Sequence, residues 1–112
     1  MESILTSIKK LLGIAEDYSQ FDIDIIIHIN SVFFILKQLG VGPSKGFAIH
    51  SDEETWIDFL GESEDWESVK TYTYLKVKLL FDPPSSQSAA DAIDRTAKEY
   101  EWRFTVHSET EV

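Results

Sequence analysis

The most apolar stretch of the chain, SQFDIDIIIHINSVFFILKQL at residues 19–39, decides the fold. Ser19 and Asp22 match the spacing of a helix capping box at its start, with Asp in the place that Glu usually takes. Four polar residues are spaced 4, 3 and 7 positions apart and so fall on one stripe of a helix: Asp24, His28, Ser31 and Gln38. We therefore predict a long central helix over about residues 19–39, buried on most of its sides.

A membrane span is the rival interpretation of this stretch, because about 20 apolar residues cross a bilayer. Its polar side chains argue against that interpretation, since each would be costly in hydrocarbon: Asp24, His28, Asn30 and Lys37. The sequence thus predicts a helix inside a folded core and no membrane partner.

Helices are also predicted on both sides of the central stretch. Residues 4–12 place apolar side chains on one helical face, and Gly13 follows where a helix would end. Residues 40–46, GVGPSKG, are a loop by composition. After Pro83 and Pro84, a stripe at i, i+4, i+7 and i+11 predicts a long C-terminal helix over about residues 86–105; the stripe is Ile93, Ala97, Tyr100 and Phe104.

Residues 66–82 fit two structures. From Val69 onward, aliphatic and Thr residues alternate with Lys and Tyr residues, which is typical of a strand. Val69, Tyr72, Lys76 and Leu80 also share one face of a helix. An uninterrupted run of about 16 residues is long for a strand, and this length favours the helix.

Composition limits the classes of function. The chain has 112 residues, 43% of them apolar, so we expect one hydrophobic core and a single domain over residues 1–112. Its 20 acidic and 10 basic residues give a formal net charge of −10, which repels phosphate backbones and anionic membranes. The absence of cysteine excludes disulfides and thiolate chemistry. The first residues lack the continuous apolar run of a secretory signal, so we expect the protein to be made and kept in a cytoplasm.

No catalytic, cofactor or metal site is predicted. The glycine loop at residues 40–46 follows a helix and lacks the Gly-Lys-Ser/Thr ending of a phosphate-binding loop. His28, His50 and His107 lie too far apart in sequence to form a clustered metal site. The spacing of the carboxylates does not exclude a glycoside hydrolase, but nothing singles out one pair. We therefore expect a protein that is not an enzyme and binds no cofactor.

Two sets of residues are candidates for contact with other proteins. The first is an acidic run without an intervening Lys or Arg, and it comprises Asp52, Glu53, Glu54, Asp58, Glu62, Glu64, Asp65 and Glu67. Such a run is usually a solvated negative face, and a partner-facing surface is the alternative. The second set is aromatic, either core residues or interface anchors, and it comprises Trp56, Trp66, Tyr72, Tyr74 and Trp102. Three Trp and four Tyr beside seven Phe are generous for one small core, which favours some aromatic residues on a partner surface.

Several stretches, taken in order along nearly the whole chain, resemble one known family. They are SILTSIKKLLGI at 3–14, FDIDIIIHINS at 21–31, QLGVGP at 38–43, TW at 55–56, DFLG at 58–61, VKTY at 69–72, YLKVKLLFDPP at 74–84 and EWR at 101–103. This pattern resembles the head–tail connector proteins of long-tailed phages and prophages. The likeness lies in the order and length of the segments, because none of them is a catalytic motif.

The resemblance implies an all-α domain, a small bundle of about five helices, and favours helix over strand for residues 66–82. It implies a structural protein of the virion, made in the bacterial cytoplasm, that forms a dodecameric ring at the portal vertex and joins capsid to tail. Its partners would be other copies of itself, the portal protein and a downstream connector or tail protein. DNA would pass through the ring without specific binding. If the acidic run faces the channel or a tail-side surface, its charge would keep the phosphate backbone from adhering; on the outer wall of the ring it would serve solubility alone.

Two other classes of function remain open at this point. The first is an acidic protein-binding module, regulatory or mimicking the charge of DNA, encoded by a prophage. The second is a small hydrolase or metal-dependent enzyme. The first would show carboxylates spaced like phosphates on one face, and the second a pocket with converging carboxylates or a bound metal.

Overall fold

Five α-helices account for the regular structure of the described part of the chain. The computed structural model describes residues 2–62 and 65–110. The helices are α1 (Ile4–Leu12), α2 (Asp22–Gln38), α3 (Trp56–Leu60), α4 (Trp66–Phe81) and α5 (Gln87–Thr110). Over these residues the only β-type pairing is an isolated bridge between Ser3 and Thr55. The predicted all-α bundle of about five helices is confirmed.

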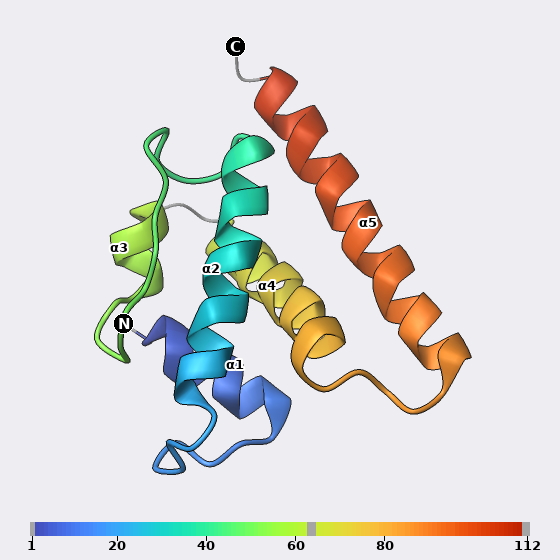
Figure 1. Ribbon diagram of the computed structural model, residues 1–112. Helices are drawn as coiled ribbons and strands as arrows, with labels where there is room; N and C mark the ends of the chain where they lie inside the picture. Colours follow the sequence, from blue (N-terminus) through green and yellow to red (C-terminus); the bar gives the residue numbers. More distant parts are fainter. Residues whose placement is uncertain (1, 63–64, 111–112) are drawn as a thin grey trace.

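Helix α4 is the centre of the bundle and settles the ambiguous segment as helical. It contacts α1, α2 and α5, and Figure 1 shows it lying between α2 and α5. Val69, Thr73 and Val77 are buried at i, i+4 and i+8, and the Thr73 hydroxyl donates to the Val69 carbonyl at 2.8 Å. The alternation that is typical of a strand does not lead to a strand here. A helix lets the residues of α4 contact α1, α2 and α5 on different sides.

Helix α2 crosses in front of α1 and α4 in Figure 1 and is buried along one side. Its buried residues are Ile25, Ile29, Val32, Phe33 and Leu36. The helix begins at Asp22 rather than near residue 19, and the predicted capping box does not form, because Phe21 is the N-cap and no side chain caps it. Asp22 instead forms an ion pair with α1.

The partner of Asp22 is Lys9, a lysine with only 2% of its surface exposed. Its Nζ donates to the backbone carbonyls of Glu16 at 3.0 Å and Tyr18 at 2.7 Å. The same Nζ lies 2.8 Å from Asp22 Oδ1, an ion pair outside hydrogen-bond geometry. Lys9 thereby fastens the loop between α1 and α2 to the body of the protein.

Helix α5 is longer than the predicted 86–105, since it extends to Thr110. It runs along the right-hand side of Figure 1 and packs against α4. Ala97 is fully buried, and the ring of Phe104 meets the ring of Tyr72 edge to face, with centroids 5.5 Å apart. Ala97, Tyr100 and Phe104 of the predicted stripe therefore form the packing face, and the opposite side of α5 faces solvent.

The other end of the core is a cluster of aromatic rings between α2, α3 and the loop that joins them. Phe59 stacks on Phe33 and Phe47, with centroids 4.3 and 5.1 Å apart. Trp56 is fully buried and donates from Nε1 to the Ser7 hydroxyl at 2.9 Å. This bond ties α3 to α1.

Candidate functional site

The five aromatic candidates occupy three environments. Trp56 and Tyr72 are fully buried, so they are core residues with no surface left for a partner. Trp66 and Tyr74 are half-buried against the core, and the ammonium group of Lys70 lies 5.3 Å from the centre of the Trp66 ring. Trp102 has 65% of its surface exposed. Of the five, Trp102 offers the most surface to a partner.

The orientation of Trp102 follows from the residue before it. Glu101 faces α4, where it accepts a hydrogen bond from the Tyr72 hydroxyl at 2.7 Å and lies 3.7 Å from Lys76 Nζ. Burial and the Glu101 carboxylate together raise the pKa of Tyr72 far above its usual range. Tyr100 and Glu101 both face α4, and the next step of about 100° around the helix turns Trp102 away from α4 toward solvent.

The acidic candidates cover α3 and the segments on either side of it. Asp52, Glu53 and Glu62 are exposed. Asp58 closes a capping box at the start of α3, since it accepts from the Thr55 backbone N–H at 2.9 Å while its own N–H donates to the Thr55 hydroxyl. Helix α3, which these residues belong to or flank, is at the left-hand edge of the molecule in Figure 1.

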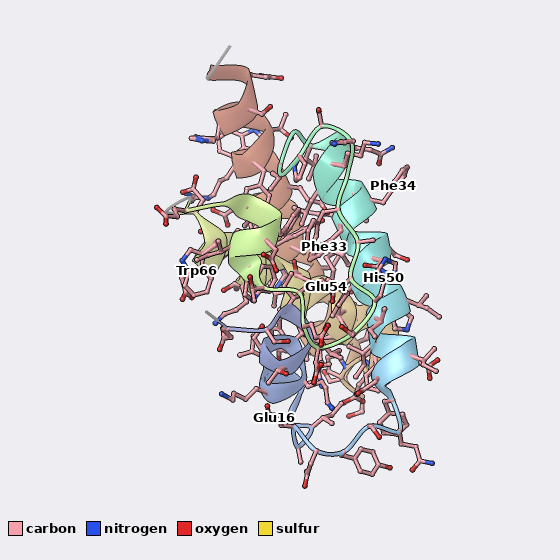
Figure 2. All side chains as sticks on the ribbon, turned by 90° about the vertical axis from the view of Figure 1, so that its left-hand side faces the viewer. Glu16, Phe33, Phe34, His50, Glu54 and Trp66 are labelled. Carbon is pink, nitrogen blue, oxygen red and sulfur yellow. The ribbon has the colours of Figure 1, made fainter. Side chains whose placement is uncertain are left out.

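Glu54 has a structural role in this run. It accepts hydrogen bonds from the backbone N–H groups of His50 at 2.8 Å and Ser51 at 3.2 Å, and Figure 2 shows Glu54 and His50 close together on this loop. Burial raises the pKa of Glu54, but the hydrogen bonds from His50 and Ser51 outweigh burial, so its pKa lies below its ordinary value. Glu54 therefore shapes the loop as a carboxylate.

The remaining acidic candidates lie near the start of α4. Glu67 is exposed, with Oε2 3.8 Å from Lys70 Nζ, and Asp65 Oδ2 lies 3.8 Å from Nε2 of His107 on α5. Glu64 lies outside the described residues. The described acidic residues form a largely exposed negative edge, in which two carboxylates also hold the local backbone.

A cleft of about 350 Å³ opens where the loop 40–43 meets the end of α3, the start of α4 and the end of α5. Its walls are of mixed character: Phe59, Val69 and Phe104 contribute apolar surface, and Asp65 and His107 contribute polar surface. Gly42 lies in this wall with φ of 86°, and a Cβ there would be 2.5 Å from Phe59 Cε1. Gly42 thus packs closely on the aromatic cluster. Residues 40–46 form no helix or strand, as their composition predicts.

Sequence reasoning missed one surface. We call it the outer face of α2, and define it by Ile23, Ile27 and Phe34 with the flanking charges Asp24 and Lys37. The three apolar side chains are 75%, 56% and 59% exposed. Figure 2 shows Phe33 turned toward the core and Phe34 on the opposite side of the same helix. A signal was present, because a helix that is apolar all round cannot bury every side in so small a protein.

Residues 2–62 and 65–110 were compared with the requirements of a metal site and of a membrane-spanning helix. No group of three or more His, Cys, Asp or Glu side chains is arranged to hold a metal ion. None of the helices described there combines the length and the apolar character that a bilayer crossing requires.

Comparison with known proteins yields one match. A family model described as "Phage connector protein" matches residues 4–111, which is nearly the whole chain. Neither a curated protein nor a solved structure matches it.

Proposed function

Because the chain belongs to the phage connector protein family, whose members are structural proteins of phage particles, we propose that it is the subunit of a ring at the portal vertex. The ring would join the capsid to the tail and leave a channel for DNA. The observation that carries this proposal is the family match over residues 4–111. The role is structural rather than catalytic, and no cofactor is involved.

The distribution of exposed surface supports a ring. Each subunit of a closed ring needs two different surfaces, since its contacts run head to tail. Trp102 on α5 and the outer face of α2 are apolar, exposed and carried by different helices. We propose Trp102 as a contact to a neighbouring subunit or to portal, with the half-buried Trp66 and Tyr74 as further candidates.

The negative edge around α3 also supports this proposal. Each subunit would bring a net charge of −10 to a ring, here proposed as dodecameric, that surrounds the path of DNA. Exposed carboxylates such as Asp52, Glu53 and Glu62, if they face the channel or the tail side, would keep the phosphate backbone from adhering. The protein would then guide DNA without specific binding.

Deletion of the gene from an inducible prophage tests the function directly. After induction, electron microscopy should show separate heads and free tails, and a plasmid copy of the gene should restore joined particles. The variant Trp102→Asp should fail to restore them, whereas Ile57→Asp, which changes an exposed apolar residue on α3, should succeed.

Normal infectious phage from the deletion strain would contradict the connector role. That result, together with recovery of a host DNA-binding protein in a pull-down, would instead support the alternative of an acidic binding module. The two outcomes are distinct, because a connector is needed for particle assembly and a regulatory module is not.

A further inference from the structure

The cleft beside the loop 40–43 is suited to a single large side chain. Its volume of about 350 Å³ lies at the lower end of the range for sites that enclose small ligands. Phe59 and Val69 are almost fully buried in its lining, whereas Leu60 and Phe104 are half-buried and still offer apolar surface. Asp65 adds a carboxylate, which accepts several hydrogen bonds. These features together favour a flat apolar group that also carries a hydrogen-bond donor.

Trp102 is the exposed side chain that best matches this description. Among the exposed large apolar residues of the described chain, Tyr18 and Trp102 alone carry a polar group on the ring. The Tyr18 hydroxyl already donates to Gln20 Oε1 at 3.1 Å. The indole N–H of Trp102 makes no hydrogen bond within residues 2–62 and 65–110. It therefore remains available to a carboxylate of another molecule, such as that of Asp65.

Trp102 points away from the cleft of its own chain. Phe104, His107 and Ser108 are the residues of α5 that line the cleft, and they point about 120–160° away from Trp102 around the helix. Helix α5 lies at the edge of the molecule in Figure 1, so the side that carries Trp102 is open to another copy. A ring of many subunits turns only slightly from one copy to the next, which places its two contact surfaces on nearly opposite sides of each subunit. Trp102 and the cleft are placed in this way.

The charges beside the two surfaces have opposite sign. Arg95 is exposed at i−7 from Trp102, on the same side of α5, and the other charges of residues 94–103 are held in ion pairs. Asp65 lines the cleft, and Glu62 is exposed two residues after Leu60 of its wall. Attraction between these groups offsets part of the repulsion between two copies that each carry a net charge of −10.

We propose that Trp102 of one subunit inserts into this cleft of the next subunit and forms the head-to-tail contact of the ring. The indole lies against Leu60 and Phe104 and donates from Nε1 to the Asp65 carboxylate. A Trp side chain seated in a pocket is the kind of residue that supplies most of the binding free energy at an interface. The inference rests on the proposed connector function and adds to it the two surfaces that meet between neighbouring subunits.

Cross-linking through introduced cysteines tests this contact, because the chain contains no cysteine of its own. Val106→Cys places a thiol at i+4 from Trp102 on the same side of α5, and Ser44→Cys places one next to Pro43, which lines the cleft. Both are small replacements at exposed positions. Copies with one substitution each are co-expressed in the induced deletion strain and treated with a short bis-maleimide. Cross-linked dimers that contain one copy of each variant are the expected product.

Two controls accompany the mixture. Either variant alone should give at least about ten-fold fewer dimers, since a head-to-tail contact pairs two different surfaces. Leu11→Cys in place of Ser44→Cys should also give few dimers, because Leu11 is exposed on α1, which does not line the cleft.

The direction of the contact is tested by placing Trp102→Ala in one copy or the other. In the copy with Val106→Cys it should lower the yield of mixed dimers at least about ten-fold, as expected for truncation of a dominant interface residue. In the copy with Ser44→Cys it should leave the yield within about two-fold, because that copy contributes only its cleft to the cross-linked contact. The two mixtures contain the same number of altered subunits, so a general defect in assembly affects both equally.

Four results would overturn the inference. They are joined particles without mixed dimers, equal dimer yields from Val106→Cys alone, the same loss whichever copy carries Trp102→Ala, and cross-links from Val106→Cys to portal instead of to another subunit. Each of them leaves the connector role intact, since that role is tested by the gene deletion. Normal phage from the deletion strain would contradict the connector role itself.

Discussion

The substitution Lys9→Met measures how strongly the buried lysine holds the loop between α1 and α2. Methionine keeps the length and apolar stem of the side chain but removes the hydrogen bonds to the carbonyls of Glu16 and Tyr18 and the ion pair with Asp22. Hydrogen bonds to a charged group contribute about 1.5–3 kcal/mol each. Glu16 and Tyr18 are exposed residues and the Asp22 side chain is 26% exposed, so water recovers part of this loss.

We expect Lys9→Met to lower the free energy of unfolding by about 2 kcal/mol, which corresponds to a fall in Tm of about 8 °C for a domain of this size. Urea and thermal unfolding followed by circular dichroism and Trp fluorescence give both quantities. Lys10→Met is the matched control, because Lys10 is exposed, stands in the same last turn of α1 and loses the same interaction with the helix dipole. Equal losses in the two variants would refute the reasoning, since only Lys9 makes the buried contacts.

Two further predictions concern the α4–α5 contact and the glycine loop. Burial and the Glu101 carboxylate raise the pKa of Tyr72, so the neutral phenol stabilises the fold fully below its unfolded pKa of about 10, and this contribution is lost as the pH rises further. Tyr72→Phe should lower the free energy of unfolding by about 1 kcal/mol at neutral pH and flatten its decline above pH 10, as measured by urea titrations at several pH values. Gly13 and Gly42 both have positive φ, but only at Gly42 would a Cβ meet another residue, at 2.5 Å from Phe59 Cε1. Gly13→Ala should cost about 1–2 kcal/mol of backbone strain. Gly42→Ala should cost about 1–3 kcal/mol more in overpacking, and equal losses in thermal unfolding would contradict this close approach.

The helices could be predicted from sequence where a stripe or a breaker was present. Ala97, Tyr100 and Phe104 of the predicted stripe pack against the core, and Gly13 ends α1 with φ of 82°. The long segment now seen as α4 was ambiguous, because residues such as Tyr72 and Thr73 suit both a helix face and a pleated strand. The contacts of α4 with three other helices favour the helix over the strand. The periodicity of a single segment carries no information about such contacts.

The surfaces were harder to predict for the same reason. Trp56, Tyr72 and Trp102 look alike in sequence, yet the first two are buried and the third is exposed. The two buried residues make hydrogen bonds to distant parts of the chain: Trp56 to Ser7, 49 residues away, and Tyr72 to Glu101, 29 residues away. Local patterning indicates which residues are able to be buried, but the packing of distant segments selects among them.

The net charge of −10 also limits which surfaces of the protein can associate. Copies with such a charge repel one another, so they associate only through surfaces on which charge is balanced or absent. The outer face of α2 has this property, because Asp24 and Lys37 offset each other around three apolar side chains. The described carboxylates between Asp52 and Glu67 belong to α3, the segments beside it and the first turn of α4, whereas the outer face belongs to α2. A subunit built in this way has a face of locally balanced charge on α2, and its negative edge is turned toward solvent.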